Sequence, residues 1–459
     1  FCSEAEETMT NPASGRESSG TGNAREVALD VLYEILEKGA FSHLVLGQAL
    51  SKYQYLGKHD RAFITRVTEG TLEYLLQLDF VLGQYSSVPV KKMKPLIRTL
   101  LRMSAYQILY MDRVPDAAVC SEAVKLARKR RFQGLTGFVN GVLRTLAREK
   151  EKLEFPDDSI RFSVPSWLLK LWNRELGPRQ TRQVLAYFLE EHPLMVRCCP
   201  GAASRDAILA SLQSQGVSVR EHPLLEEVLI LEKLDYLEAL EAFQKGWIQV
   251  QDPSSVLVGR AAAPAPGAQV LDVCGAPGGK ALHIAQLLNG TGHVEVRDIS
   301  PVKVQRIQEN IRRLGVSNLS ALVRDALDPD PSWKDRADLL VADLPCSGLG
   351  VLGRKPDIKW RVTPESLDSL AGLQRQILSV VWQYVKPGGI LIYSTCTIDR
   401  KENEDNRDWF LGQFPFRPVS LEGRLGEKLK AETLKEGYIQ LLPGIWPCDG
   451  FFLSVMQRI

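Results

Sequence analysis

The chain has 459 residues, of which 44% are hydrophobic and 24% are charged, as is typical of soluble globular proteins. No apolar run reaches the roughly 18 residues that a transmembrane helix needs, and the N-terminus lacks a signal-peptide pattern, so we expect a cytoplasmic protein without a membrane partner. The eight cysteines form no CxxC pair, and neither they nor the histidines have metal-ligand spacing. We therefore expect free thiols and no metal site.

The net charge of +2 conceals a basic block near the N-terminus. Residues 25–150 contain 20 lysines and arginines against 12 acidic residues, whereas residues 1–24 and 151–459 each have a net charge of −3. Such a block attracts polyanions because binding releases their counterions. The run Arg128-Lys129-Arg130-Arg131 is either a solvated helix end or a phosphate contact. We favour the phosphate contact because the surrounding block is basic.

The chain begins with two contrasting segments. Residues 1–24 are rich in Ser, Gly, Glu and Thr, and this composition predicts a disordered tail. From Arg25 the apolar residues recur at helical spacing up to about residue 150, which predicts an all-α domain at 25–150. Glycines and prolines divide this domain into further helical stretches. They cover about 42–55, 59–85, 93–111, 116–130 and 134–150.

The remaining chain predicts two more domains. Residues 151–250 combine short helical pieces with strand-like segments (LMVRCCP, VSVR and LEEVLIL), so we expect a small α+β subdomain. From 251 to 459 strands and helices alternate, which predicts an α/β Rossmann-like domain. A Pro-Gly-Gly turn at 387–389 precedes the strand ILIYSTC. Ligands of such a domain bind at the carboxyl ends of its strands.

Strands of this predicted domain end near aspartates, at the carboxyl ends where ligands bind. One strand runs into the loop DVCGAPGGK, and the next three end near Asp298, Asp325 and Asp343. The glycines allow the backbone to approach a ligand, while a carboxylate after the second strand suits ribose hydroxyls. A dinucleotide is the competing ligand, but the loop has no G-x-G-x-x-G and contains Pro277. A nucleoside with an amino-acid tail suits the loop better, and Lys280 could pair with the carboxylate of that tail.

Two cysteines lie just past strand ends of this domain. Cys346 occurs in DLPCSGLG and Cys396 in YSTCT, so both should reach the ligand edge and lie close together. A cytosine ring explains two thiols, because C5 becomes nucleophilic only after a thiolate adds at C6. A second group can then assist release of the adduct. Asp343 could hydrogen-bond the amidine edge of the cytosine and support the developing charge.

The motifs of two regions resemble known families. Residues 25–150, with AREVALDVLYEIL, DRAFITRVTEGTLEY and GFVNGVLR, resemble the NusB-like RNA-binding domain. The motifs DVCGAPGGK, VRDIS, ADLPCSGLG, RKPDIKW, KPGGILIYSTCTI and CDGFF resemble those of RNA cytosine-C5 methyltransferases. The whole order over 25–459 is similar to the bacterial 16S ribosomal RNA enzymes of the Fmu/Sun type. DNA cytosine methyltransferases differ from this family because they use the PC cysteine as the nucleophile.

The resemblance implies an S-adenosyl-L-methionine-dependent enzyme that methylates small-subunit ribosomal RNA, and we expect a monomer. It implies that Cys396 is the nucleophile, that Cys346 assists product release, and that Asp343 serves both reaction and cofactor. The cofactor pocket that it implies consists of Cys274, Gly275, Ala276, Pro277, Gly278, Gly279, Lys280, Asp298, Asp325 and Asp343. The family loop usually has Ala at Gly275 and Thr at Ala281, so this chain departs from the pattern at two positions.

Two alternatives to an RNA methyltransferase remain open. A non-catalytic RNA-binding assembly factor could retain a methyltransferase fold, although both cysteines and all the edge aspartates are present. An oxidoreductase on a dinucleotide-binding fold is the other alternative.

Overall fold

The computed structural model describes residues 24–234 and 236–459, so the predicted disordered tail lies outside the described residues except for Ala24. The described chain forms two compact units. A helical unit contains residues 24–190 and 352–361. A second unit contains residues 191–351 and 362–459, and it includes both β-sheets. No helix in the described ranges is long and apolar enough to span a bilayer.

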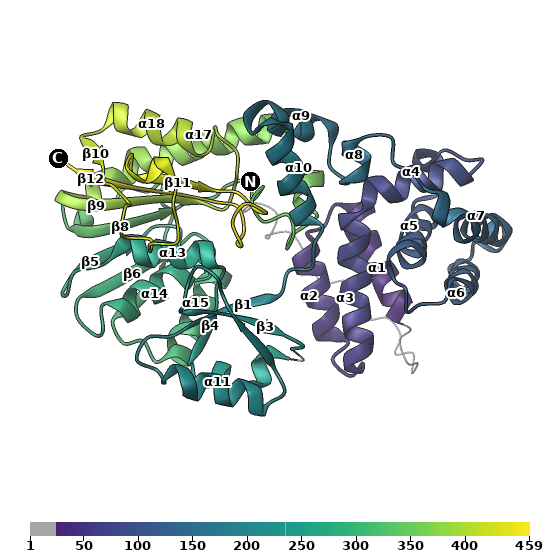
Figure 1. Cartoon of the computed structure of the whole chain (residues 1–459), viewed down its shortest axis with the longest axis horizontal. Helices are drawn as coiled ribbons and strands as arrows, with labels where there is room; N and C mark the ends of the chain where they lie inside the picture. Colours follow the sequence, from purple (N-terminus) through teal and green to yellow (C-terminus); the bar gives the residue numbers. More distant parts are fainter. Residues whose placement is uncertain (1–23, 235) are drawn as a thin grey trace. The chain divides into compact units, whose positions relative to one another are not determined.

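The helical unit confirms the predicted all-α domain (Figure 1). Its apolar residues recur at helical spacing and form one core beneath the first seven helices. Those helices are α1 (Ala24–Lys38), α2 (Ser42–Lys52), α3 (Lys58–Glu73), α4 (Leu75–Tyr85), α5 (Pro95–Tyr110), α6 (Asp116–Lys129) and α7 (Thr136–Glu149). Shorter elements complete the unit, namely α8 (Asp158–Arg161), α9 (Ser166–Glu175), α10 (Gly177–Phe188) and α16 (Ile358–Arg361).

The predicted helix over 59–85 is wrong in one respect, because the structure divides it at Tyr74 into α3 and α4. The backbone N–H of Leu76 at the start of α4 donates to the hydroxyl of Ser163, at 3.0 Å. A residue that follows α8 therefore satisfies the new helix start. Segment 352–361 also packs here, since the indole N–H of Trp360 donates to the carbonyl of Leu72 at 2.7 Å.

Residues 191–250 form the predicted small α+β subdomain, which is ferredoxin-like. The predicted start at residue 151 is wrong, because residues 151–190 are helical and belong to the helical unit. Its antiparallel sheet has the order β2-β3-β1-β4. The elements are β1 (Leu194–Cys198), α11 (Arg205–Ser214), β2 (Ser218–Glu221), β3 (Val228–Glu232), α12 (Glu241–Gln244) and β4 (Ile248–Val250). The sequence had indicated three strands, and β4 is the fourth.

The C-terminal region forms an eight-stranded sheet with the order β10-β12-β9-β8-β5-β6-β7, in which β11 pairs with β12 (Figure 1). Strands β5 to β9 are parallel neighbours, whereas β10, β11 and β12 are antiparallel additions. The strands are β5 (Gln269–Asp272), β6 (His293–Asp298), β7 (Leu319–Val323), β8 (Ala337–Asp343), β9 (Val385–Thr395), β10 (Phe416–Pro418), β11 (Tyr438–Leu441) and β12 (Phe451–Arg458). The helices are α13 (Pro253–Ala262), α14 (Gly279–Leu287), α15 (Pro301–Leu314), α17 (Pro364–Val381) and α18 (Glu404–Gln413).

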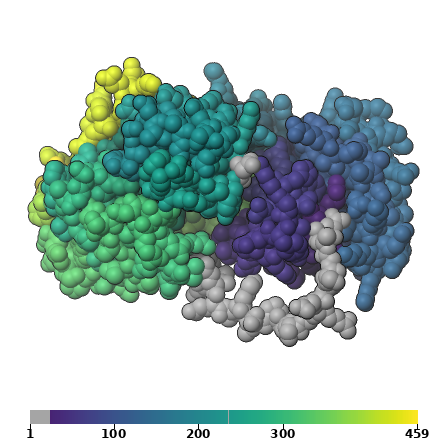
Figure 2. All heavy atoms as spheres, turned by 90° about the horizontal axis from the view of Figure 1, so that it is seen from below, coloured from purple at the N-terminus to yellow at the C-terminus, as the bar shows by residue number. Residues whose placement is uncertain are grey.

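Helices cover both faces of this sheet, as expected for buried parallel strands. Helices α13, α14 and α15 pack on one face, and α17 and α18 pack on the other. The middle subdomain joins the first face: the guanidinium of Arg313 on α15 donates to the carbonyls of Phe243 and Ile248, at 2.9 and 3.2 Å. Figure 2 shows the teal surface of the subdomain against the green surface of the sheet domain. The predicted turn at 387–389 lies inside β9, which has an irregular register at its start.

Candidate active site

The carboxyl ends of the parallel strands gather four aspartates at one edge. Strands β5, β6 and β8 end at Asp272, Asp298 and Asp343, and Asp325 follows β7 by two residues. The parallel register sets Asp298 beside Val323 at the end of β7. Adjacent parallel strands that end together bring their terminal side chains to the same edge. The sequence-predicted carboxylates therefore converge.

The glycine-rich loop at residues 273–278 follows β5 and contacts the end of β6 before helix α14 begins. The N–H of Gly275 donates to the carbonyl of Arg297 at 2.8 Å, which ties the loop to β6. Gly278 precedes α14 with φ = +98°, a conformation that favours glycine. A Cβ at Gly275 would lie 2.4 Å from Val296 Cγ2 and 2.5 Å from Asp272 Oδ2, so the alanine that is usual in the family would require these two side chains to shift. Of the remaining predicted loop residues, Ala276 and Pro277 lie between these two glycines, Cys274 precedes them, and Gly279 follows as the first residue of α14.

Asp272 lies under this loop and ends the first of the four strands whose aspartates mark the predicted ligand edge, although the sequence interpretation gave it no role of its own. Its side chain is 0% exposed, and neither carboxyl oxygen has a hydrogen-bond partner within the described residues. Burial and the nearby charge of Asp343 raise the pKa of Asp272 to about 8. Asp272 is therefore mainly protonated at neutral pH and can donate a hydrogen bond. The same burial raises the pKa of Cys274 well above its usual value.

Asp298 and Asp325 each use one carboxylate oxygen to hold their own loop. Asp298 Oδ1 accepts from the N–H of Ser300 at 3.0 Å, and Asp325 Oδ1 accepts from the N–H of Leu327 at 2.9 Å. Within the described residues the second oxygen of each carboxylate has no other hydrogen-bond partner. Each aspartate can therefore accept a hydrogen bond from a ligand without losing its loop contact.

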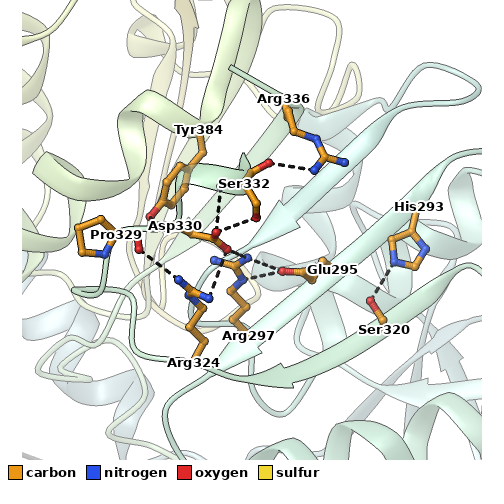
Figure 3. Close-up of polar contacts among 10 residues, drawn as sticks. All are labelled: His293, Glu295, Arg297, Ser320, Arg324, Pro329, Asp330, Ser332, Arg336 and Tyr384. Carbon is orange, nitrogen blue, oxygen red and sulfur yellow. Dashed lines mark hydrogen bonds and ion pairs between the residues drawn. The ribbon is translucent and has the colours of Figure 1, made fainter. Parts of the chain in front are cut away.

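A polar network joins β6 to the loop after β7 and to the segment before β9 (Figure 3). The buried guanidinium of Arg297 contacts Glu295 and Asp330, with its Nη2 2.6 Å from Asp330 Oδ2. The backbone N–H of Asp330 donates to the hydroxyl of Tyr384 at 2.7 Å. These contacts tie the loop after β7, which includes Asp325, to β6 and to the segment before β9.

Lys280 and Asp343 form a half-buried ion pair at the first turn of α14. Lys280 Nζ lies 2.6 Å from Asp343 Oδ2, and the hydroxyl of Ser394 donates to Asp343 Oδ1 at 2.8 Å. Burial opposes the charged form of Lys280, but the attraction and hydrogen bond of Asp343 outweigh it and raise the lysine pKa. The charge of Cys396 raises this pKa further, so the Lys280 ammonium and the Cys396 sulfur lie within electrostatic range of each other.

The two predicted cysteines meet beside this pair. Cys346 Sγ lies 3.3 Å from Cys396 Sγ, within hydrogen-bond distance for sulfur. The hydrogen bond to Cys396, followed by burial, raises the pKa of Cys346 well above its usual value. Cys346 therefore keeps its proton and can donate it toward Cys396. This division suits an attacking thiolate at Cys396 and a proton donor at Cys346.

Backbone contacts between three loops fix the cysteine geometry. The N–H of Gly350, four residues after Cys346, donates to the carbonyl of Cys396 at 3.0 Å. The N–H of Gly450 donates in turn to the carbonyl of Gly350 at 2.8 Å. A Cβ on Gly350 would lie 2.0 Å from the carbonyl oxygen of Gly450. The glycines of DLPCSGLG and CDGFF are thus needed for close backbone approach.

A buried carboxyl, Glu402, joins the same loops and was also missed by the sequence interpretation. Glu402 Oε2 accepts from the N–H of Ser347 and from the amide of Gln374, both at 2.9 Å. The hydroxyls of Ser347 and Thr397 are 2.7 Å apart, which links the residues that follow the two cysteines. Burial raises the pKa of Glu402 to about 7. The signal available in the sequence was only a Glu six residues after Cys396.

Comparison with family models identifies all three regions. A model described as "16S rRNA methyltransferase RsmB/F" matches residues 260–457. The "NusB family" model matches residues 22–148, and a model described as "Methyltr_RsmF/B-like, ferredoxin-like domain" matches residues 164–235. The fold and the paired cysteines thus occur in a methyltransferase domain that is attached to a NusB-type domain.

Relatives extend this match over almost the whole chain. The chain is 36% identical to the "Probable ribosomal RNA small subunit methyltransferase B" of Bacillus subtilis, over 95% of this chain and 99% of that protein. It is 31% identical to the "Ribosomal RNA small subunit methyltransferase B" of Vibrio cholerae, over 95% and 98%. The chain belongs to the RsmB/F family of ribosomal RNA methyltransferases, which confirms the family that its motifs indicated.

Solved structures share the fold. The crystal structure of PH0851 covers 96% of this chain and 100% of its own, with a TM-score of 0.80 at 23% identity. A structure of NSun6 from Pyrococcus horikoshii with SFG covers 64% of this chain and 98% of its own, with a TM-score of 0.58 at 21% identity.

Proposed function

We propose that this chain transfers the methyl group of S-adenosyl-L-methionine to C5 of a cytosine in small-subunit ribosomal RNA, through a covalent bond between Cys396 and C6. The observation that carries this proposal is the 3.3 Å distance between the sulfurs of Cys346 and Cys396 at the ligand edge of the sheet. Membership of the RsmB/F family supports ribosomal RNA as the substrate and the cytoplasm as the location.

The residues at the edge fit S-adenosyl-L-methionine. The loop from Cys274 to Lys280 allows close backbone approach, and Asp298 and Asp325 each retain an oxygen for a hydroxyl or amine donor. Protonated Asp272 supplies one more donor under the loop. When bound, the cofactor supplies an electrophilic methyl group on its sulfonium.

The chemistry of the remaining residues follows from their protonation. The Cys396 thiolate, stabilised by the ammonium of Lys280, adds to C6 of the cytosine and makes C5 nucleophilic. Asp343 accepts a hydrogen bond from the base while Ser394 and Lys280 hold it in position. After methyl transfer a solvent water accepts the proton from C5, the C–H electron pair re-forms the C5–C6 double bond, and the C6–S bond breaks so that its electron pair returns to Cys396. Cys346 stabilises the departing thiolate by donating its proton in a hydrogen bond.

Trapping of the covalent adduct tests this assignment. With small-subunit ribosomal RNA and cofactor, Cys396→Ala should transfer no methyl group and form no adduct, while cofactor affinity is retained. Cys346→Ala should methylate the base and then stall, so a protein–RNA complex should survive denaturing electrophoresis. The buried thiol variant Cys199→Ala is the control and should turn over normally.

The opposite pattern would contradict the proposal. A stable complex in Cys396→Ala with none in Cys346→Ala would reverse the two roles, as in DNA cytosine methyltransferases. If the wild-type protein binds ribosomal RNA but transfers no methyl group to it, a non-catalytic assembly factor is the better interpretation. Binding of NAD in place of S-adenosyl-L-methionine would favour the oxidoreductase alternative.

A further inference from the structure

The structure separates the basic run at 128–131 into paired and unpaired cations. Lys129 Nζ lies 2.6 Å from Glu26, and Arg130 Nη2 lies 2.6 Å from Asp30, so both neutralise acidic residues of helix α1. The side chains of Arg128 and Arg131 are exposed and form no ion pair or hydrogen bond within the described residues. Their charges are therefore available to an external anion.

Arg128 lines a groove between helices α6 and α7. The groove has a volume of about 680 Å³, and small residues such as Ala117, Gly137 and Ala147 line it and leave space between the helices. Its polar lining consists of Ser121, Lys125, Arg128, Thr136, Asn140 and Arg144, together with Asp116.

The charge of this groove is positive. Its carboxylate, Asp116, is paired with Lys150 at 3.0 Å, and Lys125 is paired with Glu122 at 2.7 Å. Arg144 resembles Arg128, since it is exposed and has no ion pair or hydrogen bond within residues 24–234 and 236–459. Two uncompensated guanidinium groups therefore define the electrostatics of the groove.

The two arginines enter the groove from different helices, Arg128 from the last turn of α6 and Arg144 from within α7. Two cations that line one groove can each contact a different phosphate of a polyanion. The hydroxyl and amide groups between them can hydrogen-bond phosphate or ribose oxygens.

We propose that the α6–α7 groove binds the phosphate backbone of the RNA, with Arg128 and Arg144 as the contacting cations. The proposal rests on the proposed function for the identity of the polymer as RNA. Guanidinium groups bind phosphates in a bidentate manner, and such contacts fix position without reading sequence. The groove would therefore hold the substrate while the base is recognised elsewhere.

A charge-matched pair of variants tests the groove with an in-vitro transcript of small-subunit ribosomal RNA. The double variant Arg128→Gln/Arg144→Gln should lower RNA affinity about tenfold or more at low salt. The slope of log affinity against log salt should fall by about 1.4 to 1.8, since two phosphate contacts are lost. The control Lys92→Gln/Lys94→Gln removes two exposed cations of the same unit that do not line the groove, and should change both quantities much less.

Several outcomes would contradict the proposal that the α6–α7 groove binds RNA. Equal losses of RNA affinity in both double variants would indicate diffuse electrostatic attraction to the whole unit. An unchanged RNA affinity in Arg128→Gln/Arg144→Gln would exclude the groove as an RNA-binding site. If that variant binds the naked transcript normally but binds ribosomal particles weakly, the groove contacts a protein. Thermal unfolding shows whether each variant is folded. Failure of the proposed function is a separate result, because it appears as a wild-type protein that methylates no RNA.

Discussion

Ionisable groups lie in opposite environments in two regions of the molecule, buried at the edge of the large sheet and exposed along the α6–α7 groove. At the sheet edge, Asp272 and Glu402 are fully buried, and their pKa values are raised to about 8 and about 7. In the groove, Arg128 and Arg144 are exposed to solvent and form no ion pair within the described residues. Desolvation makes the first set responsive to pH, whereas exposure makes the second set responsive to salt. Chemistry and binding thus depend on different physical variables within one chain.

The largest effect that we expect comes from the backbone contacts beside the cysteines. Gly350→Ala would bring its Cβ to 2.0 Å from the carbonyl of Gly450, and backbone atoms of two crossing loops cannot move aside easily. We expect a loss of about 3 kcal/mol in the free energy of unfolding and at least a tenfold loss of turnover. Urea unfolding and a methyl-transfer assay measure these quantities.

Gly372→Ala is the matched control, because Gly372 lies within α17 and a Cβ there meets nothing within 4 Å. It should stabilise the protein by up to about 1 kcal/mol. Equal effects of the two substitutions would show that close approach at Gly350 does not support the cysteine loops.

Glu402→Gln should change the pH dependence of the unfolding free energy, because it removes a buried ionisable carboxyl. The pKa of Glu402 is raised from 4.5 to about 7 on folding, so its neutral form favours the folded state. That stabilisation is complete below about pH 4.5 and is lost as pH rises through about 7. Between pH 5 and 8.5 the wild type should lose about 2 to 3 kcal/mol more than the variant. Parallel pH curves of the unfolding free energy would contradict burial of an ionisable Glu402.

Asp298→Ala tests the ligand edge itself. The free oxygen of Asp298 should accept a hydrogen bond from the cofactor, and a bond to a charged group is worth roughly 1.5–3 kcal/mol. We expect S-adenosyl-L-methionine to bind about tenfold or more weakly by calorimetry. Asp328→Ala, an exposed carboxylate in the loop after β7, should bind it normally. An unchanged dissociation constant in Asp298→Ala would place the ribose elsewhere.

The sequence predicts the aspartates at the edge of the large sheet better than it predicts the details of the helical unit. Parallel strands that alternate with helices bring Asp298, Asp325 and Asp343 to one edge whatever their loops do, so local periodicity was sufficient there. The break at Tyr74 was missed because the N–H of Leu76, at the start of the new helix, donates to the hydroxyl of Ser163, which is 87 residues away.

The role of Asp272 and the whole of Glu402 were missed for a related reason. Their raised pKa values come from burial by several elements, which no short motif encodes. The basic run at 128–131 was recognised, but only the fold reveals that Lys129 and Arg130 are paired with α1.

The smallest effect should come from Glu26→Gln, which removes the partner of Lys129 and a 3.3 Å neighbour of Arg130. Lys129 is exposed, so water and salt screen this pair, and its loss should cost less than about 1 kcal/mol of unfolding free energy. That cost should disappear near 1 M salt, where screening acts over only about 3 Å. The same variant should bind RNA slightly more tightly at low salt, because it releases cations beside Arg128. Weaker RNA binding by Glu26→Gln, with an unchanged melting temperature, would contradict a phosphate contact at this end of the groove.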